Sequence, residues 1–345
     1  MTSSHNGPSL PAGKLPLPLL SELLAELPTH SPRLLVGPSV GEDAAVIDFA
    51  RGDDRVLVVK SDPITFATDE IGYYAVNICV NDLAVTGATP RFYLPTLLLP
   101  AGDTNEEQVR SIYRQIGAAC ADLNIDVAGG HSEITHAVNQ PVVAGTLLGE
   151  APRNGFVTSG GGRPGDVMLM VGVAPVEGTS LLAREMRDTL LAKGWSADDL
   201  SVAAGFLHDP GISVLAPART VLKAGGITSM HDPTEGGIAT GLAEMALAAG
   251  TGLEVDLDAV PIPDVSQRLC DAFGLDPLGL IASGALLATV RSAQAEAVIS
   301  RCREQGWQAA VIGRLTDDGG LRAYQDGRRV DFPTFAADEL TKLFA

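Results

Sequence analysis

Basic residues are scarce in this 345-residue sequence and are unevenly distributed along it. There are 24 Lys and Arg against 42 Asp and Glu, which gives a formal net charge of −18. Nucleic acid is therefore not expected as a partner, because phosphate backbones select basic surfaces. Between Ser61 and Pro90 there is no Lys or Arg at all. The same segment holds four acids, which are Asp62, Asp69, Glu70 and Asp82.

The sequence is also poor in cysteine and lacks long apolar runs. Its four cysteines are widely spaced and form no Cys-x-x-Cys pair, so we expect small core residues in a reducing compartment. These residues are Cys79, Cys120, Cys270 and Cys302. No uninterrupted apolar span reaches membrane length, and residues 1–14 show no signal-peptide core. The prediction is a cytoplasmic protein without a membrane partner.

Length and composition predict two packed domains. Strand-like and helix-like segments alternate through both halves, on either side of the glycine-rich stretch 160–165. That stretch is a linker, because Pro164 and a strand-like segment follow where a dinucleotide site needs a helix. We expect an arm with a short helix over 1–32, an N-terminal α/β domain over 33–150, a C-terminal domain over 163–320, and a hairpin with a tail over 321–345.

Three acids lie in short polar islands within apolar sequence: Asp43, Asp62 and Asp82. Asp82 falls near the apolar face of a helix predicted over 69–86. Asp62 follows a strand predicted over 55–60. Burying an ionised carboxylate is costly unless a partner neutralises it. We expect no basic residue to neutralise these acids. A divalent cation is then the most economical partner, and carboxylates with open positions suit Mg²⁺ bound to phosphates. An ordinary acidic loop is the alternative for the Gly41-Glu42-Asp43 turn.

Two further glycine motifs are candidate ligand sites. The stretch 129–133, Gly-Gly-His-Ser-Glu, follows a predicted strand and could bring backbone N–H groups close to an anion. A tight turn with a surface His131 is the alternative. The stretch 231–237, His-Asp-Pro-Thr-Glu-Gly-Gly, precedes a predicted helix. Thr234 could cap that helix, whose free N–H groups could bind phosphate. Capping alone leaves Glu235 unexplained, so we interpret this motif as functional.

Two positions have weaker functional interpretations. Residues Glu177 to Ser180 lie where a predicted strand leads into a predicted helix, and we interpret them as capping the N-terminus of that helix. Lys14 could fold over nucleotide phosphates, although an exposed solubilising lysine explains it equally. The classical phosphate loop is excluded, because no G-x-x-x-x-G-K-[ST] sequence exists here.

In this order the motifs resemble the superfamily of aminoimidazole ribonucleotide synthetase, the PurM-like proteins. This superfamily includes thiamine-monophosphate kinase, selenophosphate synthetase and the hydrogenase-maturation protein HypE. The motif sequences of this chain most resemble those of HypE. The motifs are Gly-Glu-Asp-Ala-Ala-Val at 41–46, Ser-Asp-Pro-Ile-Thr-Phe at 61–66, Val-Asn-Asp-Leu-Ala-Val-Thr-Gly-Ala at 80–88, and those at 129–133 and 231–237.

The resemblance implies a two-domain fold: an N-terminal α/β domain forming a dimeric β-barrel with a second subunit, and a C-terminal α+β domain. It implies ATP bound in a cleft reached by the N-terminal arm, and Mg²⁺ held by Asp43, Asp62 and Asp82. Phosphoryl transfer, to activate an oxygen or to phosphorylate a small molecule, is the implied chemistry.

We therefore predict three groups of site residues. Metal ligands are Asp43, Asp62 and Asp82. Nucleotide-binding residues are Lys14, Gly41, Glu42, Asn81, Gly129 and Gly130. Groups that orient or activate the acceptor are His131, Asp232 and Glu235.

Two departures from the HypE pattern predict a different acceptor. HypE carries a C-terminal cysteine that is carbamoylated and dehydrated to thiocyanate with ATP, whereas this sequence ends Leu343-Phe344-Ala345. The Arg of the HypE-type Asp-Pro-Thr-Arg-Gly-Gly is Glu235 here. Two alternatives stay open: a small-molecule kinase similar to thiamine-monophosphate kinase, and a non-catalytic nucleotide-binding partner in a maturation complex.

Overall fold

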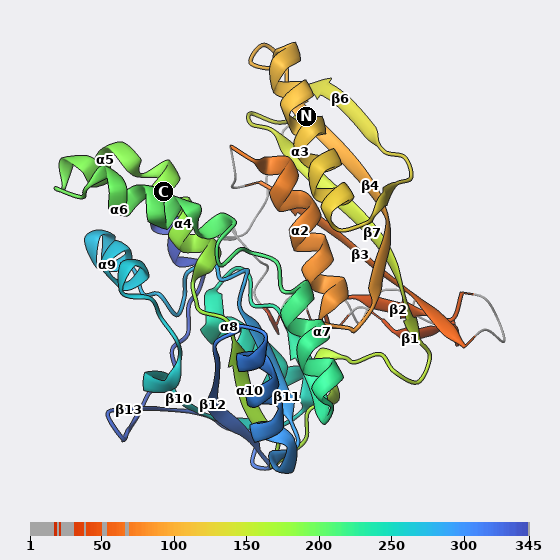
Figure 1. Cartoon of the computed structure of the whole chain (residues 1–345), viewed down its shortest axis with the longest axis vertical. Coiled ribbons are helices and arrows are strands. Elements are labelled where there is room, and N and C mark those ends of the chain that lie inside the picture. Colours follow the sequence, from red (N-terminus) through yellow and green to blue (C-terminus); the bar gives the residue numbers. More distant parts are fainter. Residues whose placement is uncertain are drawn as a thin grey trace, which may run out of the picture.

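The computed structural model describes residues 17–18, 21, 31–37, 39–49, 54–65 and 69–343. They form two seven-stranded sheets, each with its own helices (Figure 1). Both sheets are open within these residues, so the described chain forms no closed barrel by itself. All four cysteines are free and buried, as predicted. Among the described helices, none has both the length and the apolar character needed to span a bilayer.

The first sheet has the strand order β1-β2-β3-β7-β4-β5, with β6 also paired to β4. One face is covered by a helix that is buried along nearly its whole length, and a second helix packs against that one. The elements are β1 (Leu34–Val36), β2 (Ala45–Ile47), β3 (Arg55–Ile64), α2 (Ile71–Ala84), β4 (Thr89–Pro100), α3 (Glu106–Asp122), β5 (Asp126–Val127), β6 (His131–Thr135) and β7 (Val142–Pro152).

The second sheet has the order β14-β13-β10-β12-β8-β11-β9. Its strands are β8 (Val167–Val171), β9 (Ile227–His231), β10 (Gly252–Asp256), β11 (Leu286–Val290), β12 (Ala309–Thr316), β13 (Leu321–Gln325) and β14 (Arg328–Val330). Its helices are α4 (Val176–Glu185), α5 (Arg187–Ala192), α6 (Ala197–Ala204), α7 (Leu215–Ala224), α8 (Gly237–Ala249), α9 (Asp264–Phe273) and α10 (Ala295–Glu304).

Helix α2 joins the two halves of the molecule. It packs on the first sheet and also contacts α7 of the second half (Figure 1). The side chain of Asn81 secures this junction: Asn81 Nδ2 donates to Ile212 O at 2.7 Å, and Val214 N donates to Asn81 Oδ1 at 2.8 Å. Being buried between two domains explains why α2 is apolar almost all round.

Two local predictions and one alternative interpretation were wrong. Strand β3 continues through Asp62 and Pro63 to Ile64 and does not end at a corner. Proline is tolerated there because β2 pairs only with residues 57–59 of β3. On that side of β3, Pro63 therefore has no strand to which a backbone N–H would have to donate. The stretch after Gly130 is strand β6, parallel to β4, and not the tight turn that was the alternative interpretation. The Ser283-Gly284 dipeptide predicts a β-hairpin, which does not form because β11 pairs with β8 and β9.

Candidate functional site

Three carboxylates from distant parts of the chain meet at the junction of the two halves. Asp43 precedes β2, Asp82 lies on α2, and Asp232 follows β9. Each offers an oxygen, and these oxygens lie within 4.8 Å of one another. We predicted Asp43 and Asp82 as metal ligands and Asp232 as an acceptor-side group, but the structure places all three together. Asp62, the third predicted ligand, is not a member of this cluster.

His231 holds Asp43 in place. Its Nδ1 lies 2.8 Å from Asp43 Oδ2, and its Nε2 lies 3.2 Å from Glu244 Oε2 on α8. Burial favours the neutral imidazole, but the two carboxylates outweigh it and raise the pKa of His231 well above its usual value. The two carboxylates therefore favour the protonated imidazolium of His231, which would balance the charge of Asp43.

Hydrogen bonds connect the Gly41-Glu42-Asp43 turn to the residues at the start of the second half. Glu42 accepts hydrogen bonds from Ser159 N and Gly160 N, both at 3.2 Å, and Ser159 Oγ donates to Asp43 Oδ2 at 2.8 Å. Gly41 has φ +86, and a Cβ there would lie 2.7 Å from Glu244 O. Glycine is required because the turn is left-handed and packs directly on α8.

A lysine neutralises part of the cluster, so our expectation that no basic residue would do so is wrong. Lys60 Nζ lies 3.0 Å from Asp82 Oδ1 and 3.4 Å from Asp62 Oδ2. The sequence contained the signal: Lys60 immediately precedes Ser61, and residues two apart on a strand share a face. Lys60 and Asp62 therefore point together from β3 toward α2.

The cluster nevertheless keeps carboxylate oxygens without partners. Asp82 Oδ2 and both oxygens of Asp232 are buried and have no hydrogen bond within the described part of the chain. Burial, opposed by Lys60, raises the pKa of Asp82 to about 7. Burial, with repulsion from Asp82 and Asp43, raises the pKa of Asp232 well above its usual value. Lys60 and His231 therefore do not meet the whole demand for positive charge.

The remaining predicted residues lie elsewhere. His131 is exposed on β6, with Nε2 3.5 Å from Glu133 Oε2. A Cβ at Gly130 would lie 2.4 Å from Pro95 O, so this glycine lets the chain run close beside β4. Gly129 adjoins it in the same connection. The amide of Asn81 is used in the domain junction described above. Lys14 lies outside the described residues.

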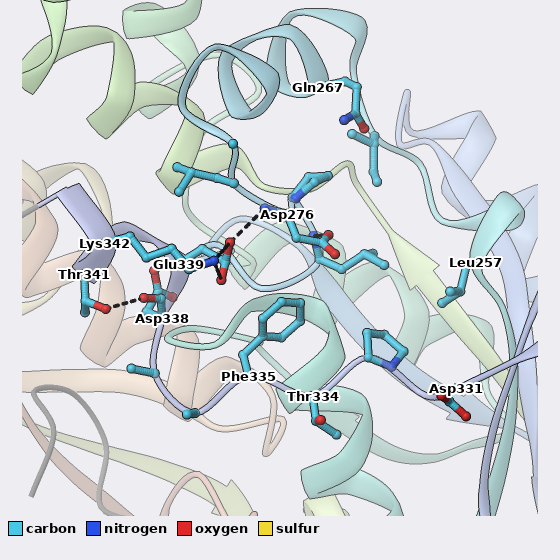
Figure 2. Close-up of a pocket in the computed structure, with 18 of the residues that line it drawn as sticks. Leu257, Gln267, Asp276, Asp331, Thr334, Phe335, Asp338, Glu339, Thr341 and Lys342 are labelled. Atoms are coloured by element: carbon cyan, nitrogen blue, oxygen red, sulfur yellow. Dashed lines mark hydrogen bonds and ion pairs between the residues drawn. The ribbon is translucent and has the colours of Figure 1, made fainter.

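Asp338, in the C-terminal tail, fills the N-terminus of α8, which we had predicted as an anion site. Gly236 is the N-cap residue, and its N–H donates to Asp338 Oδ2 at 2.7 Å, so Thr234 is not the cap. The tail is held further where Asp276 N donates to Glu339 Oε2 at 2.9 Å. Figure 2 shows these acids beside a cavity of about 1030 Å³ that the tail forms with the 274–278 loop. The chain's own carboxylate therefore replaces an external anion.

A small pocket next to the cluster contains a residue that we had misinterpreted. Glu177 is a buried residue in the first turn of α4, whose N-cap is Pro175, so it is not a capping residue. It lines the pocket together with Asp62, Glu235 and Ser283. Its significance was hidden in the sequence, because the pocket partners come from four separate segments.

Family models and known proteins agree on the classification. The model for the N-terminal domain of AIR synthase related proteins matches residues 41–151, and that for the C-terminal domain matches 163–326. A putative hydrogenase expression/formation protein of Methanocaldococcus jannaschii is 30% identical, covering 85% of both chains. The carbamoyl dehydratase HypE of Cupriavidus necator is 27% identical, covering 81% of this chain and 78% of that protein.

Solved structures show the same two-domain PurM-like fold. A HypE in complex with ATP has a TM-score of 0.68 at 24% identity, covering 90% of this chain and 89% of that one. AaThiL complexed with AMPPCP and TMP has a TM-score of 0.69 at 20% identity, covering 93% and 94%. With both domain models matched in order, this chain belongs to the family of AIR synthase related proteins and is similar to HypE.

Proposed function

We propose that this chain is an ATP- and Mg²⁺-dependent enzyme that activates or phosphorylates an acceptor, as a HypE-like member of its family. The observation that carries the proposal is the set of buried, unpaired oxygens on Asp82 and Asp232. Buried carboxylates without partners are unfavourable unless a cation binds them. Clustered carboxylate oxygens are the hard ligands that Mg²⁺ takes, usually together with substrate phosphates.

We assign the metal to Asp43, Asp82 and Asp232. Mg²⁺ bound there would neutralise phosphate charge, which is the main requirement of phosphoryl transfer. His231 fixes the orientation of Asp43, and Lys60 fixes that of Asp82. Asp62 pairs with Lys60 as well and also lines the pocket that contains Glu177 and Glu235. For Lys14, Gly41, Glu42, Gly129 and Gly130, contact with the nucleotide stays a prediction, as does an acceptor role for His131.

Asp232→Asn tests the assignment. It keeps the size of the side chain but removes the charge that lacks a partner, so the fold is retained while Mg²⁺-dependent ATP binding weakens at least tenfold. The matched control is Asp103→Asn, which changes an exposed acid in a turn. Unchanged Mg²⁺ dependence in Asp232→Asn would remove this residue from the metal site.

Two other functions are distinguishable by experiment. The fold shared with AaThiL, solved with AMPPCP and TMP, supports a small-molecule kinase as the alternative. A kinase leaves the γ-phosphate on a stable product, whereas an activating enzyme releases it as free phosphate. The solved HypE–HypF complex supports a role as a maturation partner, in hydrogenase assembly or elsewhere. Such a partner would bind ATP without turnover and co-purify with another protein.

We also propose a homodimer formed through the first sheet. The face of this sheet opposite α2 carries half-exposed or exposed apolar side chains, where a solvated antiparallel sheet carries polar ones. They alternate along the strands: Leu57, Val59, Phe92, Leu94, Leu98, Val142 and Leu148. A second copy covering this face would bury them.

A further inference from the structure

The pocket beside the metal site is acidic and contains two buried polar groups without partners. Glu177 is 5% exposed and Ser283 is fully buried. Neither Glu177 Oε2 nor Ser283 Oγ makes a hydrogen bond of acceptable geometry to any described residue. Leaving a buried hydroxyl or carboxyl group unpaired is unfavourable. Both groups line the same space, so one ligand could satisfy both.

The charged residues that line this pocket favour a cationic ligand over an anionic one. Asp62, Glu177 and Glu235 line the pocket with Thr234 and Ser283, and no Lys or Arg is present among its described lining residues. Burial raises the pKa of Glu177 to about 8, and repulsion from Glu235, Asp338 and Asp62 adds to the rise, while the nearby hydroxyl of Ser283 opposes it. An anion placed there would add to this repulsion, whereas a cation would relieve it.

The dimensions indicate what kind of cation fits. The space is about 30 Å³, roughly twice what a single water requires. It therefore holds a compact head group and not a ring. Among the described residues, the group of three potential metal ligands within 4.8 Å of one another is Asp43, Asp82 and Asp232, so Asp62, Glu177 and Glu235 do not form such a group. Hydrogen bonds from N–H groups can span a wider set of acceptors than metal coordination can.

We propose that this pocket binds the acceptor through a compact cationic nitrogen group, an ammonium or amidinium, and that Glu177 is the residue that selects it. The inference rests on the proposed function, because the pocket forms the acceptor side of the same site. Asp62 and Glu235 supply negative charge, and the unpaired Ser283 Oγ accepts one N–H bond. Glu177 ionises as the cation enters and accepts another.

Three small molecules of the same shape test the proposal: acetamidinium, acetamide and acetate carry charges of +1, 0 and −1. Their binding to the full chain is measured by ligand-observed NMR titration, with and without ATP and Mg²⁺. Acetamidinium should bind at least tenfold more tightly than acetamide, and acetate should show no saturable binding. In Glu177→Gln, acetamidinium should bind no better than acetamide. Glu185→Gln, the same change on an exposed position of α4, should behave as wild type.

Each other result contradicts the proposal. Equal binding of acetamide and acetamidinium removes the role of charge, and preferential binding of acetate reverses it. Displacement of acetamidinium by an equal concentration of K⁺ assigns the pocket to a metal ion. Unchanged selectivity in Glu177→Gln, with folding verified by circular dichroism, excludes this residue. Calorimetry with ATP and Mg²⁺ is done separately, so failure of nucleotide binding refutes the proposed function while the acetamidinium titration still decides the pocket.

Discussion

Individual residues show how far sequence reasoning can reach in this site. Asp43 and Asp82 were identifiable because acids stand out in apolar sequence. The pairing of Lys60 with Asp82 joins β3 to α2, and Lys60 lies one residue before the acidic segment 61–90, so the charge pattern of that segment does not include it. The place of Asp232 in the metal cluster depends on how β9 ends beside α2, and no local pattern specifies that contact. Which charged side chains neutralise one another can therefore be assigned only when their neighbours in the folded structure are known.

Lys60→Met should destabilise the protein, because it leaves Asp62 and the buried Asp82 without their cation. Losing charged hydrogen bonds of this kind costs about 2–3 kcal/mol, measurable by urea unfolding. Saturating Mg²⁺ should recover part of the loss, because the metal then neutralises Asp82. The control, Arg110→Met, breaks an exposed pair with Glu106 and should change stability by less than about 1 kcal/mol. Equal effects of the two substitutions would refute a special role for Lys60.

The raised pKa of Glu177 predicts a pH dependence of stability. Its pKa of about 8 in the folded protein, against 4.5 for an ordinary glutamate, means that the folded state holds a proton that the unfolded state has lost. This group's contribution is therefore fully present below pH 4.5 and falls by ~1.4 kcal/mol per pH unit up to about pH 8. Glu177→Gln removes this slope.

Urea unfolding of wild type and Glu177→Gln at pH 6 and pH 8 measures the effect. The variant should gain stability relative to wild type as the pH rises. Parallel pH profiles would mean that Glu177 is ionised in the folded protein.

At the scale of elements, periodicity and glycine position predicted most helices and strands. The range predicted as 69–86 is α2, and the helix predicted after the 231–237 motif is α8. The cap of α8 could not be predicted, because Asp338 lies 102 residues from Gly236. Strand β6 was also missed, because its residues are mostly exposed and lack an alternating pattern.

Asp338→Ala should destabilise the second half by about 1–2 kcal/mol, the usual cost of losing a helix cap. It leaves the N–H groups of Gly236 and Leu340 without their acceptor. Denaturant unfolding compared with Asp331→Ala, an exposed acid of the same tail, isolates the cap. If the two variants unfold alike, the tail does not stabilise α8.

At the scale of the whole molecule, the motif order predicted the two-domain PurM-like fold, but a single chain cannot show what covers the open face of its first sheet. We expect a dimer of twice the 35.8 kDa chain mass in sedimentation experiments. Leu94→Glu, on the apolar face, should yield monomers, because it would bury a charge in the interface. Val202→Glu, on α6 and 63% exposed in the structure, should remain dimeric. A monomeric wild type would contradict the proposed dimer.

The central claim is that both halves of the chain together build one Mg²⁺-dependent ATP site. Calorimetric titration of the full chain with ATP, first with Mg²⁺ and then with the metal chelated, tests it most directly. The carboxylate cluster predicts saturable binding with Mg²⁺ that weakens at least tenfold on chelation, since the phosphates then face Asp43, Asp82 and Asp232 without a bridging cation. Equal affinity in both conditions, or no binding in either, would contradict the claim.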